Sequence, residues 1–167
     1  MPCPRILLSV LVLVPLLAVA ADSGWRDYAN GRFGFVLSYP DSLVAGPEPT
    51  NGAGREFHSR DGEFSVAASA HFFTPDSGDS LDTRWKEELQ VLDGTISYKR
   101  KTRTWYVVSG VARDGTEYYH KLYAKGSNWA GFEITYPHAR NKKYDPWVSQ
   151  IAKKFIPFRE GDFDRIE

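Results

Sequence analysis

GFVLSYP, at residues 34–40, recurs near the far end of the chain as GFEITYP, at residues 131–137. In both heptapeptides large apolar side chains occupy every second position, which is the pattern of a strand with one buried face. Each begins at a glycine and ends at a proline, which lacks the N–H that a central strand donates to its neighbour. Seven residues are too few to indicate a duplication, so we predict two separate strands of one sheet. The side chains that they would bury together are Phe35, Leu37, Tyr39, Phe132, Ile134 and Tyr136.

Two Asp-Gly pairs predict β-hairpins. Asp61-Gly62 and Asp114-Gly115 each lie between runs of alternating residues, and a tight two-residue turn needs positive φ at both of its central positions. Before the second pair, TISYKRK at residues 95–101 predicts a further strand. Residues 22–32 are expected to form a short lead-in, and residues 46–54 a loop rich in proline and glycine.

Helical spacing of apolar residues predicts two helices. In the first, over residues 80–92, leucines and a tryptophan recur at helical intervals, and Asp93-Gly94 provides a stop. In the second, we expect Asp145 to cap the helix and Pro146 to occupy its first turn. Pro157 would end this helix. Its apolar stripe comprises Trp147, Val148, Ile151, Ala152 and Phe155.

The second hairpin predicts which side chains share a face of the sheet. If Asp114-Gly115 is a two-residue loop, Ser109 lies directly opposite His120. One face would then carry Trp105, Val107, Ser109, Val111, Tyr118, His120, Leu122 and Ala124. The other face would carry Tyr106, Val108, Gly110, Tyr119, Lys121 and Tyr123. Both faces hold enough apolar surface to need cover, so we expect helices on each side.

Antiparallel strands in succession, with two helices outside them, predict an α+β fold. We expect a central antiparallel β-sheet of about six or seven strands flanked by helices, which is an α/β/α sandwich. Residues 21–158 would form this single domain, and residues 159–167 would form an acidic flexible tail.

The first twenty residues have the layout of a secretory signal peptide. Arg5 precedes an apolar run at residues 6–17, and Ala18-Val19-Ala20 supplies a cleavage site of the small-x-small type. The run is shorter than the roughly 20 residues of a membrane span, and an uncleaved anchor is the alternative. We predict cleavage between Ala20 and Ala21, which gives a periplasmic or secreted protein with no stable membrane insertion.

Charge and cysteine content exclude several classes of function. The chain has 21 Lys and Arg residues against 21 Asp and Glu residues, so no overall field attracts nucleic acid or an acidic membrane. Its one cysteine, Cys3, precedes the apolar run, whereas the modified cysteine of a bacterial lipoprotein would follow it. A chain cut after Ala20 has no cysteine, which excludes disulfides, thiol catalysis and zinc sites built on sulfur.

Several stretches carry a resemblance to a known family: YANGRFGFVLSYP at residues 28–40, the Asp-Gly hairpins, FEITYP at residues 132–137 and DPWVSQIAKKFIPF at residues 145–158. With these stretches the sequence resembles the PsbP-like superfamily. Its members are α/β/α sandwiches that include extrinsic photosystem subunits, a Ran-binding import factor and many bacterial envelope proteins. The bacterial envelope branch, of unknown function, is the most similar. The resemblance implies a non-enzymatic accessory or binding module, and we expect it to dock another envelope protein.

A catalytic alternative rests on Ser109 and His120. If Gly126-Ser127 is a two-residue loop, Glu133 lies beside His120 and completes a row of serine, histidine and carboxylate. A three-residue loop at residues 126–128 would turn Glu133 to the opposite face and bury more carbon. A triad serine usually sits on a strained turn, whereas Ser109 lies in the middle of a strand. A non-catalytic module is therefore preferred, with a small serine hydrolase using Ser109 and His120 as the alternative.

Basic and aromatic residues are interleaved in YKRKTRTWY at residues 98–106. In a cytoplasmic protein such a segment can bind single-stranded nucleic acid, but export removes that partner. Two alternatives remain: charges that protect an exposed strand edge, or a docking surface for an anionic partner. The binding candidates are Lys99, Lys101, Tyr106, Tyr119, Lys121 and Tyr123, of which the last four share a face in the predicted register.

No metal or cofactor is expected. His58 and His71 lie on the first hairpin, but its register separates them by about 20 Å, too far to share an ion. His138 follows a proline and has no predicted partner. The glycines of residues 52–54 lack the Gly-Lys-Ser/Thr ending of a phosphate-binding loop.

Overall fold

The computed structural model describes residues 24–159. The predicted signal peptide, its cleavage site at Ala20 and Ala21, and residues 160–167 of the predicted tail lie outside the described residues. The strands are β1 (Trp25–Ala29), β2 (Val36–Pro40), β3 (Val44–Ala45), β4 (Gly54–His58), β5 (Ser65–Phe72), β6 (Gly94–Lys101), β7 (Trp105–Ala112), β8 (Thr116–Lys125) and β9 (Asn128–Pro137). The α-helices are α1 (Leu81–Val91) and α2 (Asn141–Lys154), and the short 3₁₀ helices are η1 (Pro75–Ser77) and η2 (His138–Arg140). Neither α-helix within this range has the length and apolar composition of a membrane span.

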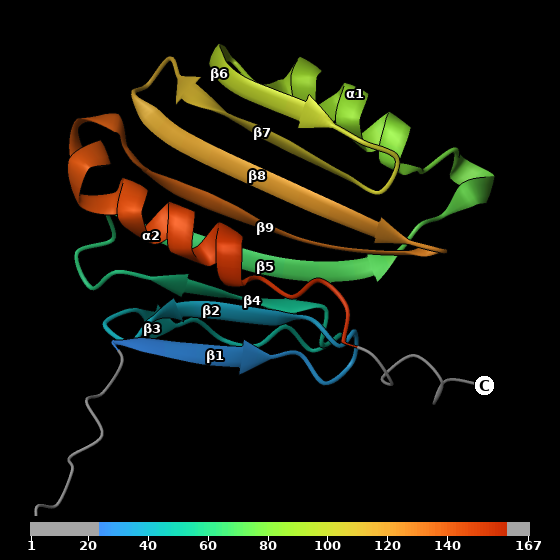
Figure 1. The fold of residues 1–167 in the computed structure, drawn as a ribbon, viewed down its shortest axis with the longest axis horizontal. Coiled ribbons are helices and arrows are strands. Elements are labelled where there is room, and N and C mark those ends of the chain that lie inside the picture. Colours follow the sequence, from blue (N-terminus) through green and yellow to red (C-terminus); the bar gives the residue numbers. More distant parts are fainter. Residues whose placement is uncertain (1–23, 160–167) are drawn as a thin grey trace, which may run out of the picture.

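The architecture is a seven-stranded antiparallel sheet with the order β3-β4-β5-β9-β8-β7-β6, together with a separate β1-β2 pair. One face of the large sheet packs against α2 and β2, and the opposite face packs against α1 (Figure 1). The predicted α+β fold, with a sheet of six or seven strands flanked by helices, is therefore confirmed. We refer to the two faces of the large sheet as the α2 side and the α1 side.

The two heptapeptides share a core, but they do not share a sheet. Phe35 and Leu37 next to and within β2, and Phe132 and Ile134 in β9, are at most 1% exposed and belong to one hydrophobic cluster. The prediction of one sheet is wrong, because β2 pairs with β1 on one edge and bridges the segment after α2 on the other. The lead-in expected over residues 22–32 contains β1, whose mixed polar sequence WRDYA gave no strand signal.

The register of the β7–β8 hairpin differs by one residue from the predicted one. Three residues separate the strands, and Gly115 closes the loop with φ +85° while its N–H donates to the Ala112 carbonyl at 2.9 Å. No residue other than glycine has positive φ within residues 24–159. Asp114 therefore does not adopt the positive φ that a two-residue turn of this kind needs. Its carboxylate instead accepts a hydrogen bond from the Thr116 N–H at 2.9 Å.

This shift exchanges the faces of β8 relative to β7. Ser109 lies opposite Tyr119, and His120 lies opposite Val108, because a slip of one residue turns every side chain of a strand over. The α2 side carries Trp105, Val107, Ser109, Val111, Glu117, Tyr119, Lys121 and Tyr123. The α1 side carries Tyr106, Val108, Gly110, Tyr118, His120 and Leu122.

The β8–β9 hairpin has the two-residue loop Gly126-Ser127, and His120 lies opposite Glu133 as that alternative predicts. Glycine at the first loop position, with φ +59°, suits a turn that needs only one positive φ. The three-residue alternative is wrong. Phe132 still shares a face with Trp105, because the register differs in the other hairpin.

The first helix follows its sequence signals and the second begins earlier than they indicate. Ser80 caps α1, where its hydroxyl accepts from the Thr83 N–H and Thr83 reciprocates. In α2, Asp145 and Pro146 lie inside the helix and not at its start, so the predicted cap is wrong. The extra turn buries Tyr144 completely, and Asp145 instead accepts a hydrogen bond from the Tyr136 hydroxyl at 2.8 Å. Tertiary packing thus sets where this helix begins.

Candidate functional site

Ser109 and His120, the candidate catalytic pair, point to opposite sides of the sheet. The His120 Nδ1 lies 2.6 Å from the Glu88 carboxylate of α1, whereas Ser109 is on the α2 side. Glu133 does lie beside His120. Ser109, which was predicted to join them, is on the other face of the sheet. The serine hydrolase alternative therefore has no triad, and that prediction is wrong.

The polar groups on the α1 side tie helix α1 to the sheet. Glu88 contacts His120, and the ring of Tyr106 lies 5.7 Å from the His120 ring in an edge-on arrangement. Burial raises the pKa of Tyr106, and the nearby Glu88 carboxylate raises it further, so the phenol stays neutral. These residues line a cleft of about 400 Å³ together with Glu133 and the exposed Ser69. The His120–Glu88 contact joins helix α1 to strand β8.

On the α2 side, two cations and three aromatic rings form a continuous patch across β6, β7 and β8. Lys121 Nζ lies 5.3 Å from the ring centroid of Trp105 and 5.0 Å from that of Tyr123. The Arg100 guanidinium carbon lies 5.6 Å from the same Trp105 centroid. We call this patch the cation–aromatic surface, and its members are Tyr98, Arg100, Trp105, Lys121 and Tyr123.

Strand register brings these residues together. Arg100 on β6 and Lys121 on β8 both pair with Val107 of β7 from either side, and Trp105 pairs with Tyr123 one step further along. Directly opposed and diagonal neighbours on one sheet face are close enough for long side chains to meet. The four residues other than Tyr98 therefore form two adjoining cross-strand rows.

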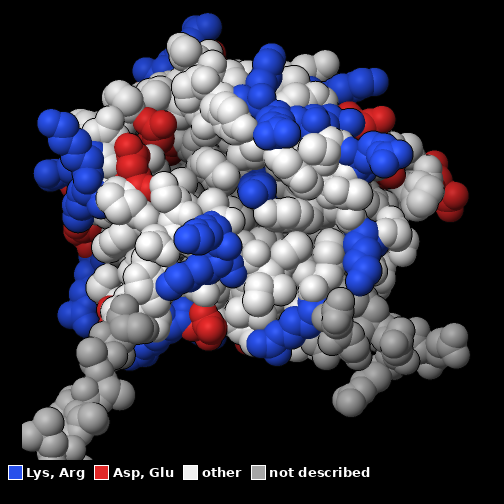
Figure 2. All heavy atoms as spheres, viewed as in Figure 1, with Lys and Arg blue, Asp and Glu red and all other residues white. Residues whose placement is uncertain are grey.

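The cation–aromatic surface lies beyond the part of the sheet that α2 covers. Phe155, at the end of α2, stacks on Tyr123 with ring centroids 5.9 Å apart and marks the limit of that cover. Tyr98 is 50% exposed on the edge strand β6. In the same view as Figure 1, basic groups predominate over acidic ones on this side of the molecule, with uncharged surface between them (Figure 2).

The cations of this surface carry unbalanced charge. Within residues 24–159 no carboxylate forms an ion pair with Arg100 or Lys121, whereas Lys101 on the other side of β6 pairs with Asp82. A cation over an aromatic ring is attracted by the ring's quadrupole and keeps its charge available to a ligand. The surface therefore presents positive charge on a rigid aromatic base.

The structure sorts the six predicted binding residues into three groups. Lys121 and Tyr123 belong to the cation–aromatic surface, and Tyr119 lies beside it on the same face of β8. Tyr106 is 1% exposed on the opposite side, so the prediction that it shares a face with the other three is wrong. The remaining two, Lys99 and Lys101, lie on the α1 side of β6.

Arg100, Trp105 and Tyr98 were not among the predicted binding residues, although all three lie in the quoted segment YKRKTRTWY. Period-2 alternation groups Tyr98 with Arg100. Only the true β7–β8 register adds Trp105 beside Lys121 and Tyr123. The sequence did not specify the length of the β7–β8 loop, which sets this register.

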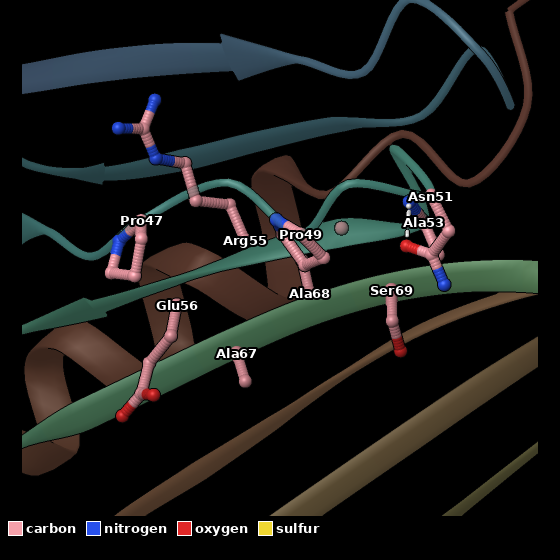
Figure 3. A pocket seen from close by; sticks show the side chains of 10 residues that line it. Pro47, Pro49, Asn51, Ala53, Arg55, Glu56, Ala67, Ala68 and Ser69 are labelled. Carbon is pink, nitrogen blue, oxygen red and sulfur yellow. Dashed lines mark hydrogen bonds between the residues drawn. The ribbon is translucent and has the colours of Figure 1, made fainter.

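A second cavity, of about 350 Å³, lies on the α1 side between the loop before β4 and strand β5. Pro47 and Pro49 of that loop line the cavity together with Ala67 and Ser69 of β5 (Figure 3). Its two charged residues already have partners, since Glu56 accepts a hydrogen bond from Ser65 and Arg55 donates one to the Gly46 carbonyl. Within the part of the chain that the structure describes, no group of three His, Asp or Glu side chains could hold a metal ion.

No protein-family model matches the sequence, and no curated protein matches it. The structure is similar to the solution structure of cyanobacterial PsbP (CyanoP) from Synechocystis sp. PCC 6803. The TM-score is 0.58 at 10% sequence identity, over 89% of this chain and 99% of that chain. A crystal structure from Bacteroides thetaiotaomicron VPI-5482 is also similar, with a TM-score of 0.51 at 16% identity, over 83% of this chain and 50% of that chain. At these identities the similarity establishes the fold.

Proposed function

We propose that this chain, whose fold is PsbP-like, is an exported accessory module that binds an anionic partner protein of the cell envelope through its cation–aromatic surface. Export is supported by the signal-peptide layout of the first twenty residues. Binding without chemistry is supported by the separation of Ser109 and His120 onto opposite faces of the sheet.

One observation carries the proposal: Lys121 Nζ lies between the rings of Trp105 and Tyr123, and no described carboxylate pairs with it. Tryptophan, tyrosine and arginine are the residues that most often dominate the energy of a protein interface. Unbalanced cations at such a surface select a partner that brings carboxylates or other anionic groups. A neutral or basic partner would leave both cations without compensation.

The test is photo-crosslinking in intact cells. A photoreactive amino acid at position 105 is expected to give a specific cross-linked product that mass spectrometry can identify, whereas the same group at the exposed Gln150 of α2 is not. Adding Lys121→Glu should reduce the product at least about tenfold, which corresponds to about 1.4 kcal/mol, because a carboxylate at this position would repel an anionic partner. Lys142→Glu, the same charge change at an exposed α2 residue, serves as the matched control.

Two results would contradict the proposal. An unchanged yield in the Lys121→Glu variant would show that charge at this surface does not select the partner. Equal products from positions 105 and 150 would show that the cross-linking is not specific to the cation–aromatic surface. Circular dichroism of each purified variant verifies that it is folded.

A further inference from the structure

Strand β6 presents an open edge of the large sheet. It pairs with β7 on one side, and no other strand within residues 24–159 pairs with it on the other. It is eight residues long, whereas β3, at the opposite edge, has only two. An edge of this length offers a row of unpaired N–H and C=O groups that another extended segment can use.

The charge of this edge limits what can pair with it. Lys99, Arg100 and Lys101 occupy its last three positions, and Arg103 follows in the turn. Two β6 strands brought edge to edge would place these cations against one another, which disfavours pairing. An acidic strand would be attracted instead. The Lys101–Asp82 ion pair does not prevent this, because Asp82 is 71% exposed and exposed pairs contribute little.

The chain contains a segment of matching chemistry. Residues 160–167, outside the described range, read EGDFDRIE and carry four acidic residues against one arginine. Within it, Asp162, Phe163 and Asp164 alternate charged and apolar side chains, as a strand with two distinct faces does, before Arg165 interrupts the pattern. This segment has the same length as β6.

We propose that residues 160–167 of one copy add to the β6 edge of a second copy as an antiparallel strand. With Asp162 opposite Lys101, Asp164 falls opposite Lys99 on the α1 side of the sheet. Phe163 then falls opposite Arg100, on the α2 side, where a ring can stack on the guanidinium. The register thus satisfies charge on one face and packing on the other.

A second copy is required because the segment starts far from its own β6. The Arg159 N–H donates to the Gly34 carbonyl at 3.0 Å, just before β2. Figure 1 shows β2 and β6 at opposite sides of the molecule, and three strand spacings of about 4.8 Å each separate β9 from β6. Eight residues span at most about 28 Å when extended. A segment that extends across the sheet to reach β6 has too few residues left to pair along that strand.

This self-association is tested on the purified chain alone, without the proposed envelope partner, although Phe163 would contact Arg100, a member of the cation–aromatic surface. Sedimentation velocity of residues 21–167 over a range of concentrations should show reversible assembly that added salt weakens. A chain that ends at Arg159 should associate at least tenfold more weakly, where tenfold corresponds to 1.4 kcal/mol. The paired change Lys99→Glu with Lys101→Glu should do the same, and Lys142→Glu with Lys153→Glu on α2 should not.

A charge swap between residues 160–167 and β6 is the decisive experiment. Asp162→Lys with Asp164→Lys should abolish assembly alone and restore it when mixed with the Lys99→Glu, Lys101→Glu chain. A chain that stays monomeric at every concentration would overturn the proposal. Assembly that survives truncation at Arg159, or a charge swap that restores nothing, would overturn it equally. The two proposals share Arg100, but assembly of the purified chain and cross-linking of an envelope partner from position 105 are measured separately, so either can fail while the other stands.

Discussion

Tyr119 packs its ring parallel to Phe132, with centroids 5.9 Å apart, beside the cation–aromatic surface on the α2 side of the sheet. Burial raises the pKa of its phenol from 10.0 to about 12. In the unfolded chain the phenol is exposed and ionises near its ordinary value. The neutral phenol therefore contributes stability that is fully present below pH 10 and is lost as the pH rises toward 12.

The variant Tyr119→Phe tests this effect. Between pH 10 and 12 its free energy of unfolding should fall less steeply with pH than that of the wild type, because the phenyl ring cannot ionise. Urea denaturation at a series of pH values measures the slope. Tyr98→Phe, at a ring that is 50% exposed, is the matched control. Equal slopes for the wild type and Tyr119→Phe would contradict the burial of this phenol.

The position of the glycine in each hairpin loop affects whether the loop length can be predicted from the sequence. In Gly126-Ser127 the glycine comes first and the loop has two residues, which is one of the two alternatives that the sequence left open. In Asp114-Gly115 the aspartate would have needed positive φ, and the chain instead adds Arg113 to the loop. Sequence alone could not distinguish these loops, because Asp-Gly is compatible with both.

At the scale of single elements, local sequence sets where α1 begins, whereas tertiary contacts set where α2 begins. Ser80 and Thr83 form a capping box, and the predicted helix over residues 80–92 is correct within one residue at each end. The start of α2 could not be predicted, because it depends on Tyr144 packing against Phe64 and Tyr136. Neither of those partners is adjacent in sequence.

The Ser80→Ala variant tests the capping box. Loss of the serine hydroxyl leaves the Thr83 N–H without its acceptor, and a lost cap lowers the free energy of unfolding by about 1 kcal/mol. Urea denaturation gives the size of this loss. Hydrogen exchange is expected to quicken first in the opening turn of α1. Ser149→Ala, in the exposed middle of α2, should cost nothing, since alanine favours a helix more than serine does. Equal stability of Ser80→Ala and the wild type would contradict the cap.

At the scale of the whole molecule, the fold consists of two sheets that share one core. The period-2 heptapeptides identified the buried positions Phe35, Leu37, Phe132 and Ile134 correctly. They could not show that β2 lies in a different sheet, because alternation reports burial and carries no information about which strand lies alongside. The α+β class was predictable because the spacing of apolar residues indicates which segments are strands and which are helices. The β1–β2 pair was not predictable, because spacing does not indicate which strands lie side by side.

The candidate site was predictable only in part. The segment at residues 98–106 contributes three residues to the cation–aromatic surface, and Lys121 and Tyr123 of the predicted binding residues also belong to it. That this surface binds a partner stays a prediction. Their assembly with Trp105 and Arg100 depends on the β7–β8 register, which sequence left open by one residue. That register also separates Ser109 from His120, so one structural feature both assembles the cation–aromatic surface and places the predicted catalytic pair on opposite faces.

The register is therefore the claim to test most directly, and the chain from Ala21 onward contains no cysteine that would interfere. Directly opposed residues of an antiparallel pair have Cα atoms about 4.5 to 5.5 Å apart, within the range that a disulfide spans. Under mild oxidation, Ser109→Cys with Tyr119→Cys should form an intramolecular disulfide. Ser109→Cys with His120→Cys should remain reduced, because those side chains point to opposite faces. The reverse outcome, a disulfide to position 120 and none to position 119, would contradict the account.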